Sequence, residues 1–244
     1  MPAGTALVLL HPFPFDASFW DGAIGALTRA DVCAYEAPGF GGRPVPIGWQ
    51  IADWADDVAD RIAATDARSA VVCGLSMGGY AALALADRRP EVVAGLVLAD
   101  TRAEADTPDA RAGRDAGIAR IEAGDYAGWA DDLLGKVVSP TAADDVRGAL
   151  RMQMRRQDAA AVCEALKALR DRPDRTGDLA RVTVPTLVVV GADDAVTPPA
   201  AAATLHEGIP GARLEVLADA GHLSAAERPE AFAAVVDDFL KGLG

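Results

Sequence analysis

The residues Gly74-Leu75-Ser76-Met77-Gly78 decide the fold, because of the sequence on either side of them. The apolar run Ala70-Val71-Val72-Cys73 precedes them and predicts a buried parallel strand, and the alanine-rich stretch from Gly79 to Ala86 predicts a helix. A serine centred in G-x-S-x-G between a strand and a helix is typical of the turn called a nucleophile elbow. Glycines two residues before and after the serine leave out Cβ atoms that would collide in so tight a turn. We therefore expect Ser76 on a strained turn, with the positive end of the helix dipole directed at it.

The composition is that of a single globular α/β domain. The chain has 244 residues, of which 51% are hydrophobic and 24% charged, and this is enough to bury a large core. The formal net charge of −13 argues against nucleic acid or an anionic membrane surface as a partner. No apolar run approaches the ~20 residues that a membrane span needs, and the first residues lack the pattern of a signal peptide. We expect a cytoplasmic protein that binds neither nucleic acid nor membrane.

The three cysteines, Cys33, Cys73 and Cys163, cannot all pair with one another, and none lies in a cluster with metal-ligand spacing. Cys33 and Cys73 lie in apolar, strand-like runs, so we expect them to be buried free thiols. The cysteine pattern therefore predicts a reduced protein with no structural metal, and no other motif indicates a cofactor.

Apolar runs alternate with helical patterns along most of the chain. The predicted strands are Ala6 to Leu10, Val32 to Tyr35, Ala70 to Cys73, Gly95 to Ala99, Thr186 to Val190 and Leu214 to Leu217. The predicted helices are a segment capped by Asp16 and ending at Leu27, Ile51 to Ala64, the helix after Ser76, Pro198 to His206 and Pro229 to Leu243. Such alternation predicts an α/β fold with a doubly wound, mostly parallel sheet.

One region breaks this alternation. From about Thr101 to Ala180 the sequence contains no convincing strand, and ~80 residues are more than one crossover needs. Its helical patterns are Ala112 to Ala123, Tyr126 to Leu134, Ala142 to Arg156 and Ala159 to Arg170. We predict a helical cap at residues 101–180, inserted before the last two strands of a core formed by residues 1–100 and 181–244.

A serine becomes a strong nucleophile only when a base removes its proton, and the base can be sought among three histidines. His206 lies in a predicted surface helix, and His11 follows the first strand, where it is expected to hydrogen-bond the loop. His222 lies on a turn directly after the last strand. It is thus expected at the carboxyl ends of the strands, where open α/β sheets place their sites. His222 is therefore the predicted base.

An acid must orient that base, and three aspartates lie at the carboxyl ends of predicted strands. Asp194 follows the strand Thr186 to Val190 and gives the chain order Ser, Asp, His that this arrangement requires. Asp193 is its neighbour, and Asp100 ends the preceding strand and could reach the same histidine. Asp194 is the best candidate, and Asp100 and Asp193 remain alternatives whose other roles would be turn formation and helix capping.

Backbone N–H groups must also hold the oxyanion that develops during acyl transfer. One is that of Met77, directly after the serine. The second is expected from Leu10-His11-Pro12-Phe13-Pro14-Phe15, where Phe13 is the one donor left between two prolines. The side chains of Phe13, Phe15 and Trp20 could line the pocket or belong to the core.

These segments together resemble the α/β-hydrolase superfamily over essentially the whole chain. The matching segments are Leu10 to Pro14, Ala37-Pro38-Gly39-Phe40-Gly41-Gly42-Arg43-Pro44, Gly74 to Gly79, Gly191 to Pro198 and Gly221-His222. The resemblance implies Ser76, Asp194 and His222 as the catalytic triad and Phe13 and Met77 as oxyanion donors. One departure is His11-Pro12, where the family usually has His-Gly and a freer backbone.

Within the superfamily the chain is similar to small capped bacterial esterases and lactonases such as the oxoadipate enol-lactonase group. This resemblance implies hydrolysis of a small carboxylic ester or lactone, without cofactor or metal. A haloperoxidase, perhydrolase or C–C bond hydrolase on the same triad is an alternative, and a small-molecule receptor on this fold is another. The sequence leaves the natural substrate and the oligomeric state open.

Overall fold

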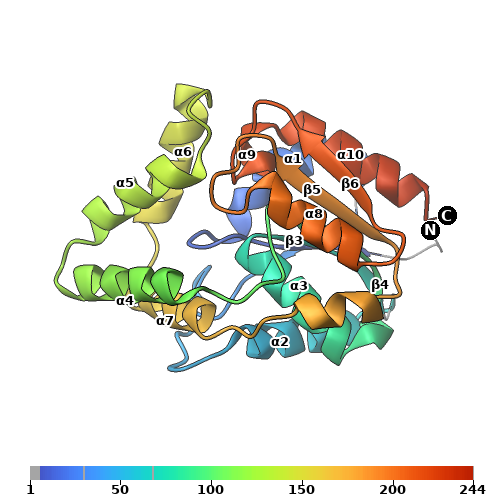
Figure 1. Ribbon diagram of the computed structural model, residues 1–244, viewed down its shortest axis with the longest axis horizontal. Helices are drawn as coiled ribbons and strands as arrows, with labels where there is room; N and C mark the ends of the chain where they lie inside the picture. The colour runs from blue at the N-terminus through green and yellow to red at the C-terminus, as the bar shows by residue number, and fades with distance from the viewer. Residues whose placement is uncertain (1–5, 30, 68, 244) are drawn as a thin grey trace.

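A six-stranded parallel sheet forms the centre of the protein, as the computed structural model of residues 6–29, 31–67 and 69–243 shows (Figure 1). The strands are β1 (Ala6–Leu10), β2 (Val32–Tyr35), β3 (Ala70–Leu75), β4 (Val93–Ala99), β5 (Thr186–Gly191) and β6 (Arg213–Leu217). Their order across the sheet is β2-β1-β3-β4-β5-β6, and all neighbours are parallel. The doubly wound sheet predicted from the sequence is therefore confirmed.

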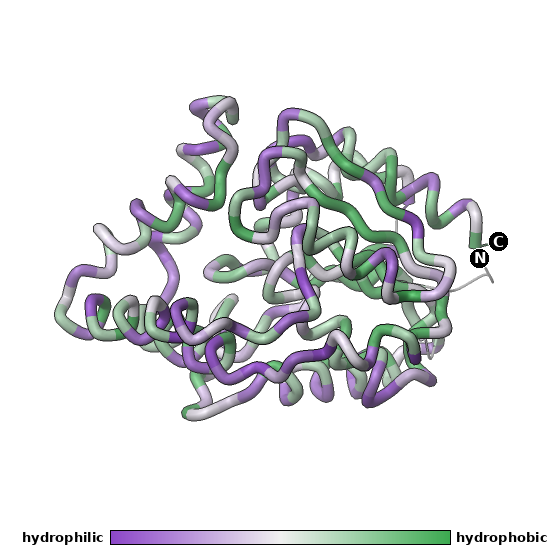
Figure 2. Tube along the Cα trace, in the orientation of Figure 1, coloured by the Kyte–Doolittle hydropathy of each residue, from purple (hydrophilic) through white to green (hydrophobic). Residues whose placement is uncertain are grey.

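Helices cover both faces of this sheet. On one face lie α2 (Ile51–Ala63), α3 (Met77–Arg88) and α8 (Pro199–Gly208), and on the other lie α1 (Asp21–Ala26), α9 (Ser224–Glu227) and α10 (Pro229–Lys241). Side chains alternate between the two cores, so that in β1 Val8 packs on the α2–α3 side and Leu9 on the α1–α10 side. Because both faces of the inner strands are buried, β1, β3 and β4 are continuous apolar runs, and Figure 2 shows hydrophobic colour along the sheet.

Two details differ from the sequence-based expectation. The segment capped by Asp16 is not one helix: it forms the 3-10 helix η1 (Ala17–Trp20), in which the Asp16 side chain accepts the amide of Ser18, followed by the short α1. Cys33 is exposed rather than buried, because it lies on β2, which is one of the two edge strands of the sheet. Cys73, on the central strand β3, is buried as expected.

The predicted insertion is present between β4 and β5. It consists of α4 (Pro108–Glu122), α5 (Tyr126–Val137), α6 (Asp144–Arg155) and α7 (Ala159–Arg170), which stand to one side of the sheet in Figure 1. The segments entering and leaving it are joined, since Arg175 N donates to Ala103 O at 2.9 Å. The 3-10 helix η2 (Pro90–Val92) precedes β4, and η3 (Thr176–Arg181) leads the chain back to β5. Among the described residues, none of the helices has the length and apolar character that would let it cross a membrane.

Candidate active site

Ser76 occupies the turn between β3 and α3 with φ 53° and ψ −111°. A residue other than glycine adopts such a positive φ only where the surrounding structure holds it there. The surroundings of this turn have no space for further Cβ atoms. One added at Gly74 would lie 2.1 Å from Gly78 O, and one added at Gly78 would lie 2.0 Å from Leu10 O. Ser76 N also donates to Ala99 O at 2.9 Å, so β4 holds the turn in place.

The structure brings Ser76, His222 and Asp194 together from the carboxyl ends of β3, β6 and β5. Ser76 Oγ lies 2.8 Å from His222 Nε2, although 146 positions separate them in the sequence. His222 Nδ1 lies 2.9 Å from Asp194 Oδ2. When Nδ1 carries its proton toward this carboxylate, Nε2 is left as an acceptor for the serine hydroxyl, which is the geometry of a proton relay.

Four donors surround the Asp194 carboxylate. Oδ1 accepts the amides of Val196 and Thr197, both at 2.8 Å, and Oδ2 accepts the Thr197 hydroxyl at 2.7 Å in addition to His222. Burial opposes ionisation of Asp194, but the hydrogen bonds from His222 and Thr197 outweigh it and lower the pKa of this carboxyl. Sequence reasoning missed Thr197, although a hydroxyl three residues after the acid is a recognisable turn signal.

The two alternative aspartates are engaged elsewhere. Asp100 is completely buried, and its carboxylate accepts Gly191 N at 2.8 Å, Ser224 N at 3.1 Å and Ser224 Oγ at 2.5 Å. Burial and the neighbouring charge of Asp194 raise the pKa of Asp100, against the effect of those donors. Asp193 Oδ2 accepts the Ser139 hydroxyl at 3.1 Å. Asp100 therefore joins the β5 turn to the segment after His222, a role that its sequence position did not indicate.

The amides of Phe13 and Met77 both remain available to a ligand, because within the described part of the chain neither donates a hydrogen bond to the protein. Met77 is the first residue of α3, where the helix dipole favours negative charge. The Phe13 ring lies edge-on to Trp129 of α5 at 5.9 Å and lines the cavity over Ser76. Phe15 and Trp20 are fully buried core residues instead.

His11 stiffens the loop that carries Phe13, as expected from the sequence. His11 Nδ1 lies 3.0 Å from Pro12 O, and Ala37 N donates to His11 Nε2 at 3.0 Å. The ring is completely buried, and this burial lowers the pKa of His11 to about 4. His11 is therefore a neutral residue that holds the backbone. His206 lies exposed on α8, away from these contacts.

A cavity of about 570 Å³ lies between the serine and the inserted helices. Its floor includes Ser76, His222 and Phe13, and its roof includes Trp129 and Leu133 of α5. Most of its aromatic and aliphatic wall comes from α4, α5 and α7, so the insertion supplies the surfaces that a substrate would touch. Within the described residues, no group of three His, Cys, Asp or Glu side chains could hold a metal ion.

Glu227 of α9 joins the His222 turn to α5, a contact that sequence reasoning missed. Its Oε2 accepts Ser139 N at 2.9 Å and Gly221 N at 3.1 Å, and its Oε1 accepts Leu223 N at 3.1 Å. His222 N itself donates to Val137 O, the last residue of α5, at 3.0 Å. The position of His222 therefore depends on the inserted helices as well as on the sheet.

Comparison with known proteins places this architecture in a family. The chain matches the model of the alpha/beta hydrolase family over residues 7–235. A pimeloyl-[acyl-carrier protein] methyl ester esterase of Neisseria meningitidis serogroup B is 35% identical over 245 residues, covering 96% of this chain and 92% of the relative. A 3-oxoadipate enol-lactonase of Acinetobacter baylyi is 30% identical over 247 residues, covering 97% of this chain and 88% of the relative.

Solved structures agree with these relatives. The malate-bound thermophilic esterase of Thermogutta terrifontis matches with a TM-score of 0.93 and 30% identity, over 98% of this chain and 90% of that one. The enol-lactonase of Burkholderia xenovorans matches with a TM-score of 0.86 and 27% identity, over 98% and 92%. The resemblance to small esterases and enol-lactonases expected from the sequence is thus confirmed. The chain belongs to the alpha/beta hydrolase family.

Proposed function

We propose that this protein is a serine hydrolase that cleaves a small carboxylic ester or lactone through an acyl-enzyme. The observation that carries the proposal is the hydrogen-bonded series from Ser76 Oγ through His222 to Asp194, at 2.8 and 2.9 Å, at the floor of a cavity. A nucleophile, a base and an orienting acid at hydrogen-bonding distance are the parts that acyl transfer requires.

The reaction proceeds in two halves. Ser76 Oγ attacks the carbonyl carbon while His222 Nε2 takes the serine proton, and the amides of Phe13 and Met77 stabilise the oxyanion. His222 then gives that proton to the departing alcohol oxygen, which leaves Ser76 acylated. Water attacks the acyl-enzyme with His222 again acting as the base, which releases the acid and restores the serine. Asp194 holds the imidazole tautomer and stabilises the imidazolium without itself accepting the proton.

The substrate is a small molecule that reaches Ser76 beneath a cap. Relatives named as a methyl ester esterase and enol-lactonases support a carboxylic ester or lactone as the substrate class.

Residues 101–180 form the cap and residues 1–100 and 181–244 the core, a division supported by the Arg175 N to Ala103 O bond where the chain leaves and rejoins the core. The net charge of −13 supports an enzyme with no nucleic-acid or anionic membrane partner, and three cysteines without pairing or metal-ligand spacing support a reduced, cytoplasmic setting.

The direct test is labelling of the nucleophile. A fluorophosphonate should modify Ser76 alone, as peptide mass spectrometry would show, and Ser76→Ala should abolish hydrolysis of p-nitrophenyl acetate while leaving the melting temperature nearly unchanged. Modification of another residue, or a fully active alanine variant, contradicts the proposal. Peroxide-dependent halogenation should be measured beside ester cleavage, and a faster halogenation would favour the haloperoxidase alternative. Specific binding of a small molecule without turnover would favour a receptor.

A further inference from the structure

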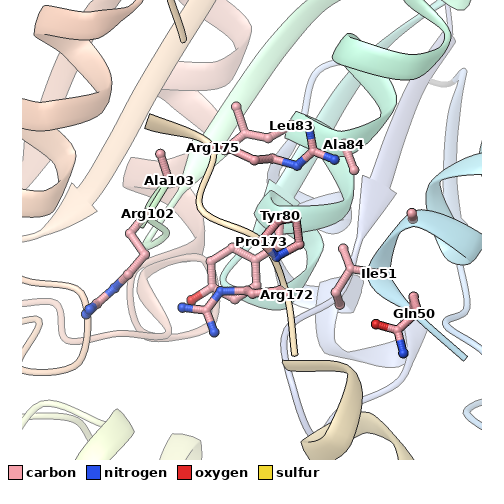
Figure 3. A pocket seen from close by; sticks show the side chains of 11 residues that line it. Gln50, Ile51, Tyr80, Leu83, Ala84, Arg102, Ala103, Arg172, Pro173 and Arg175 are labelled. Carbon is pink, nitrogen blue, oxygen red and sulfur yellow. The ribbon is translucent and has the colours of Figure 1, made fainter. Parts of the chain in front are cut away.

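A second cavity of about 210 Å³ lies further along α3 from Ser76 than the substrate cavity, on the helix face that carries Tyr80, Leu83 and Ala84. Figure 3 shows its surroundings, with Ile51 of α2 on one side, Leu83 and Ala84 of α3 above, and Pro173 of the returning segment across the middle. Ile51, Leu83, Ala84 and Pro173 give it an apolar lining, and Arg102, Arg172 and Arg175 also contribute to the wall. None of the residues proposed for the reaction lines this cavity, so the mechanism leaves it without a role.

One side chain separates the two cavities. Tyr80 lines both of them, and in the described part of the chain it is the one residue that they share. It lies one helical turn after Ser76 on α3, and it is only 8% exposed. The Tyr80 ring therefore forms the wall at which the space above Ser76 ends.

The ring is held in place from the cap side. The Arg172 guanidinium lies 4.3 Å from the centre of the Tyr80 ring, in a cation–π contact that Figure 3 shows from close by. Three acceptors fix that guanidinium: Nη1 donates to Asp106 Oδ1 at 2.6 Å and to Leu169 O at 2.8 Å, and Nη2 donates to Glu104 O at 3.1 Å. A swing of the ring would break the stacked contact, so the wall is rigid.

We propose that Tyr80 determines chain-length specificity, and that the cavity behind it is an extension of the substrate site that the ring blocks and that suits an unbranched aliphatic chain. This inference rests on the proposed ester hydrolysis. The apolar side chains of Ile51, Leu83 and Ala84 would contact such a chain. While the Tyr80 ring is in place, the longest chain that fits is shorter by the length of that cavity. The native enzyme therefore prefers short chains, and removal of the ring admits longer ones.

The experiment compares Tyr80→Ala with the native enzyme on p-nitrophenyl acetate, butyrate, hexanoate, octanoate and decanoate, and on the acetates of the matching alcohols. Each methylene that enters an apolar cavity improves binding by about fourfold. In one of the two series, the ratio of kcat/KM for the octyl-length substrate to that for the butyl-length one should rise by at least about tenfold in Tyr80→Ala.

Two control variants separate the wall from other effects. Tyr80→Phe keeps the ring, and within the described residues the Tyr80 hydroxyl makes no hydrogen bond to lose, so the length profile should match that of the native enzyme. Tyr80→Ala combined with Ala84→Leu refills the second cavity and should reverse the gain. If Tyr80→Ala has a low melting temperature, Tyr80→Leu replaces it. An unchanged profile in both series, or a gain that survives Ala84→Leu, overturns the proposal.

A binding measurement keeps this test independent of turnover. Unbranched methyl ketones of graded length mimic the substrate without a cleavable bond, and calorimetry with Ser76→Ala and with Ser76→Ala/Tyr80→Ala gives their affinities. Long ketones should bind tighter only when the ring is absent. If no ester is hydrolysed but this difference is found, the proposed reaction fails and the cavity assignment stands. If the two Ser76→Ala proteins bind the long ketones equally well while the native enzyme hydrolyses p-nitrophenyl acetate, the cavity assignment is refuted and the proposed reaction stands.

Discussion

Two buried aspartates, Asp194 and Asp100, lie near His222, and replacing each by asparagine should have a different effect. Asp194→Asn should lower the catalytic rate, whereas Asp100→Asn should lower the stability of the folded protein. In Asp194→Asn the new amide can keep its oxygen toward the amides of Val196 and Thr197, and its NH₂ group then faces His222 Nδ1. The histidine is driven into the tautomer with its proton on Nε2, which cannot accept a proton from Ser76. A change of this kind costs about 10⁴-fold in kcat in a comparable triad, or about 5.5 kcal/mol of transition-state stabilisation.

Asp100→Asn should act on the folded state instead. The asparagine oxygen keeps the two bonds from Ser224, and its NH₂ group then faces the amide of Gly191. Two buried donors confront each other, and each unsatisfied one costs about 1–3 kcal/mol. For a chain of this length, every kcal/mol lost lowers the melting temperature by about 2–4 °C. The folded fraction should keep most of its turnover, because the Asp194 to His222 contact is intact.

Both variants are assayed with p-nitrophenyl acetate for kcat and by circular dichroism for the melting temperature. Asp193→Asn is the matched control, since it sits beside Asp194 and its carboxylate contacts Ser139 rather than His222. If Asp100→Asn loses far more turnover than Asp194→Asn, the orienting acid lies on β4 and the assignment made here is wrong. If neither loses activity, another group orients His222.

Three further predictions follow from the other contacts described above. The pKa of a histidine in the unfolded chain is about 6.5, whereas burial lowers the pKa of His11 in the folded protein to about 4. Between these two pH values the unfolded chain therefore binds one more proton than the folded protein. As a result, the free energy of unfolding, measured by urea titration, should fall by about 2 kcal/mol from pH 8 to pH 5. His11→Gln should show a smaller fall, and an equal one would exclude His11 as its cause. Glu227→Gln can serve only some of the three amides that the carboxylate accepts, so kcat should fall more than KM changes, and an effect confined to KM would contradict a positioning role. Finally, His222→Ala should lose nearly all turnover, because Ser76 Oγ then has no base at hydrogen-bonding distance, and a fully active variant would exclude His222 as the base.

The sequence predicted the sheet well, because strands buried on both faces leave a simple signal. The runs at β1, β3 and β4 are apolar throughout, and that at β5 is apolar after Thr186. The structure extends β3 to Leu75 and β4 back to Val93. The failure at Cys33 has a physical cause, since strand order decides which strand lies at the edge, and order depends on contacts that are distant in sequence. The break between η1 and α1 depends on local cap geometry, which apolar spacing does not encode.

For the candidate site, motif spacing was enough to select Ser76 and His222 and to favour Asp194, but it left Asp100 and Asp193 open as alternatives. Asp100 and Asp194 both follow the carboxyl ends of neighbouring strands. Only the three-dimensional arrangement shows that Asp194 contacts His222 whereas Asp100 binds Ser224. Glu227 and Tyr80 carried no recognisable motif. Glu227 accepts the amide of Ser139, which is 88 positions away in the chain, together with two amides close to it in sequence. Tyr80 matters through the two cavities that it lines.

The inserted helices have two physical connections to the chemistry, and these carry different consequences. Their side chains form the roof of the cavity, so substitutions there change which substrates fit. The end of α5 also accepts the amide of His222 through Val137 O, and Glu227 binds both Ser139 N and the amides on either side of that histidine. A displacement of α5 would therefore move the proposed base relative to Ser76. Substitutions in the cap that tilt α5 should lower kcat even for substrates small enough to make no contact with the cap, whereas those that only reshape the roof should act on KM and chain-length preference.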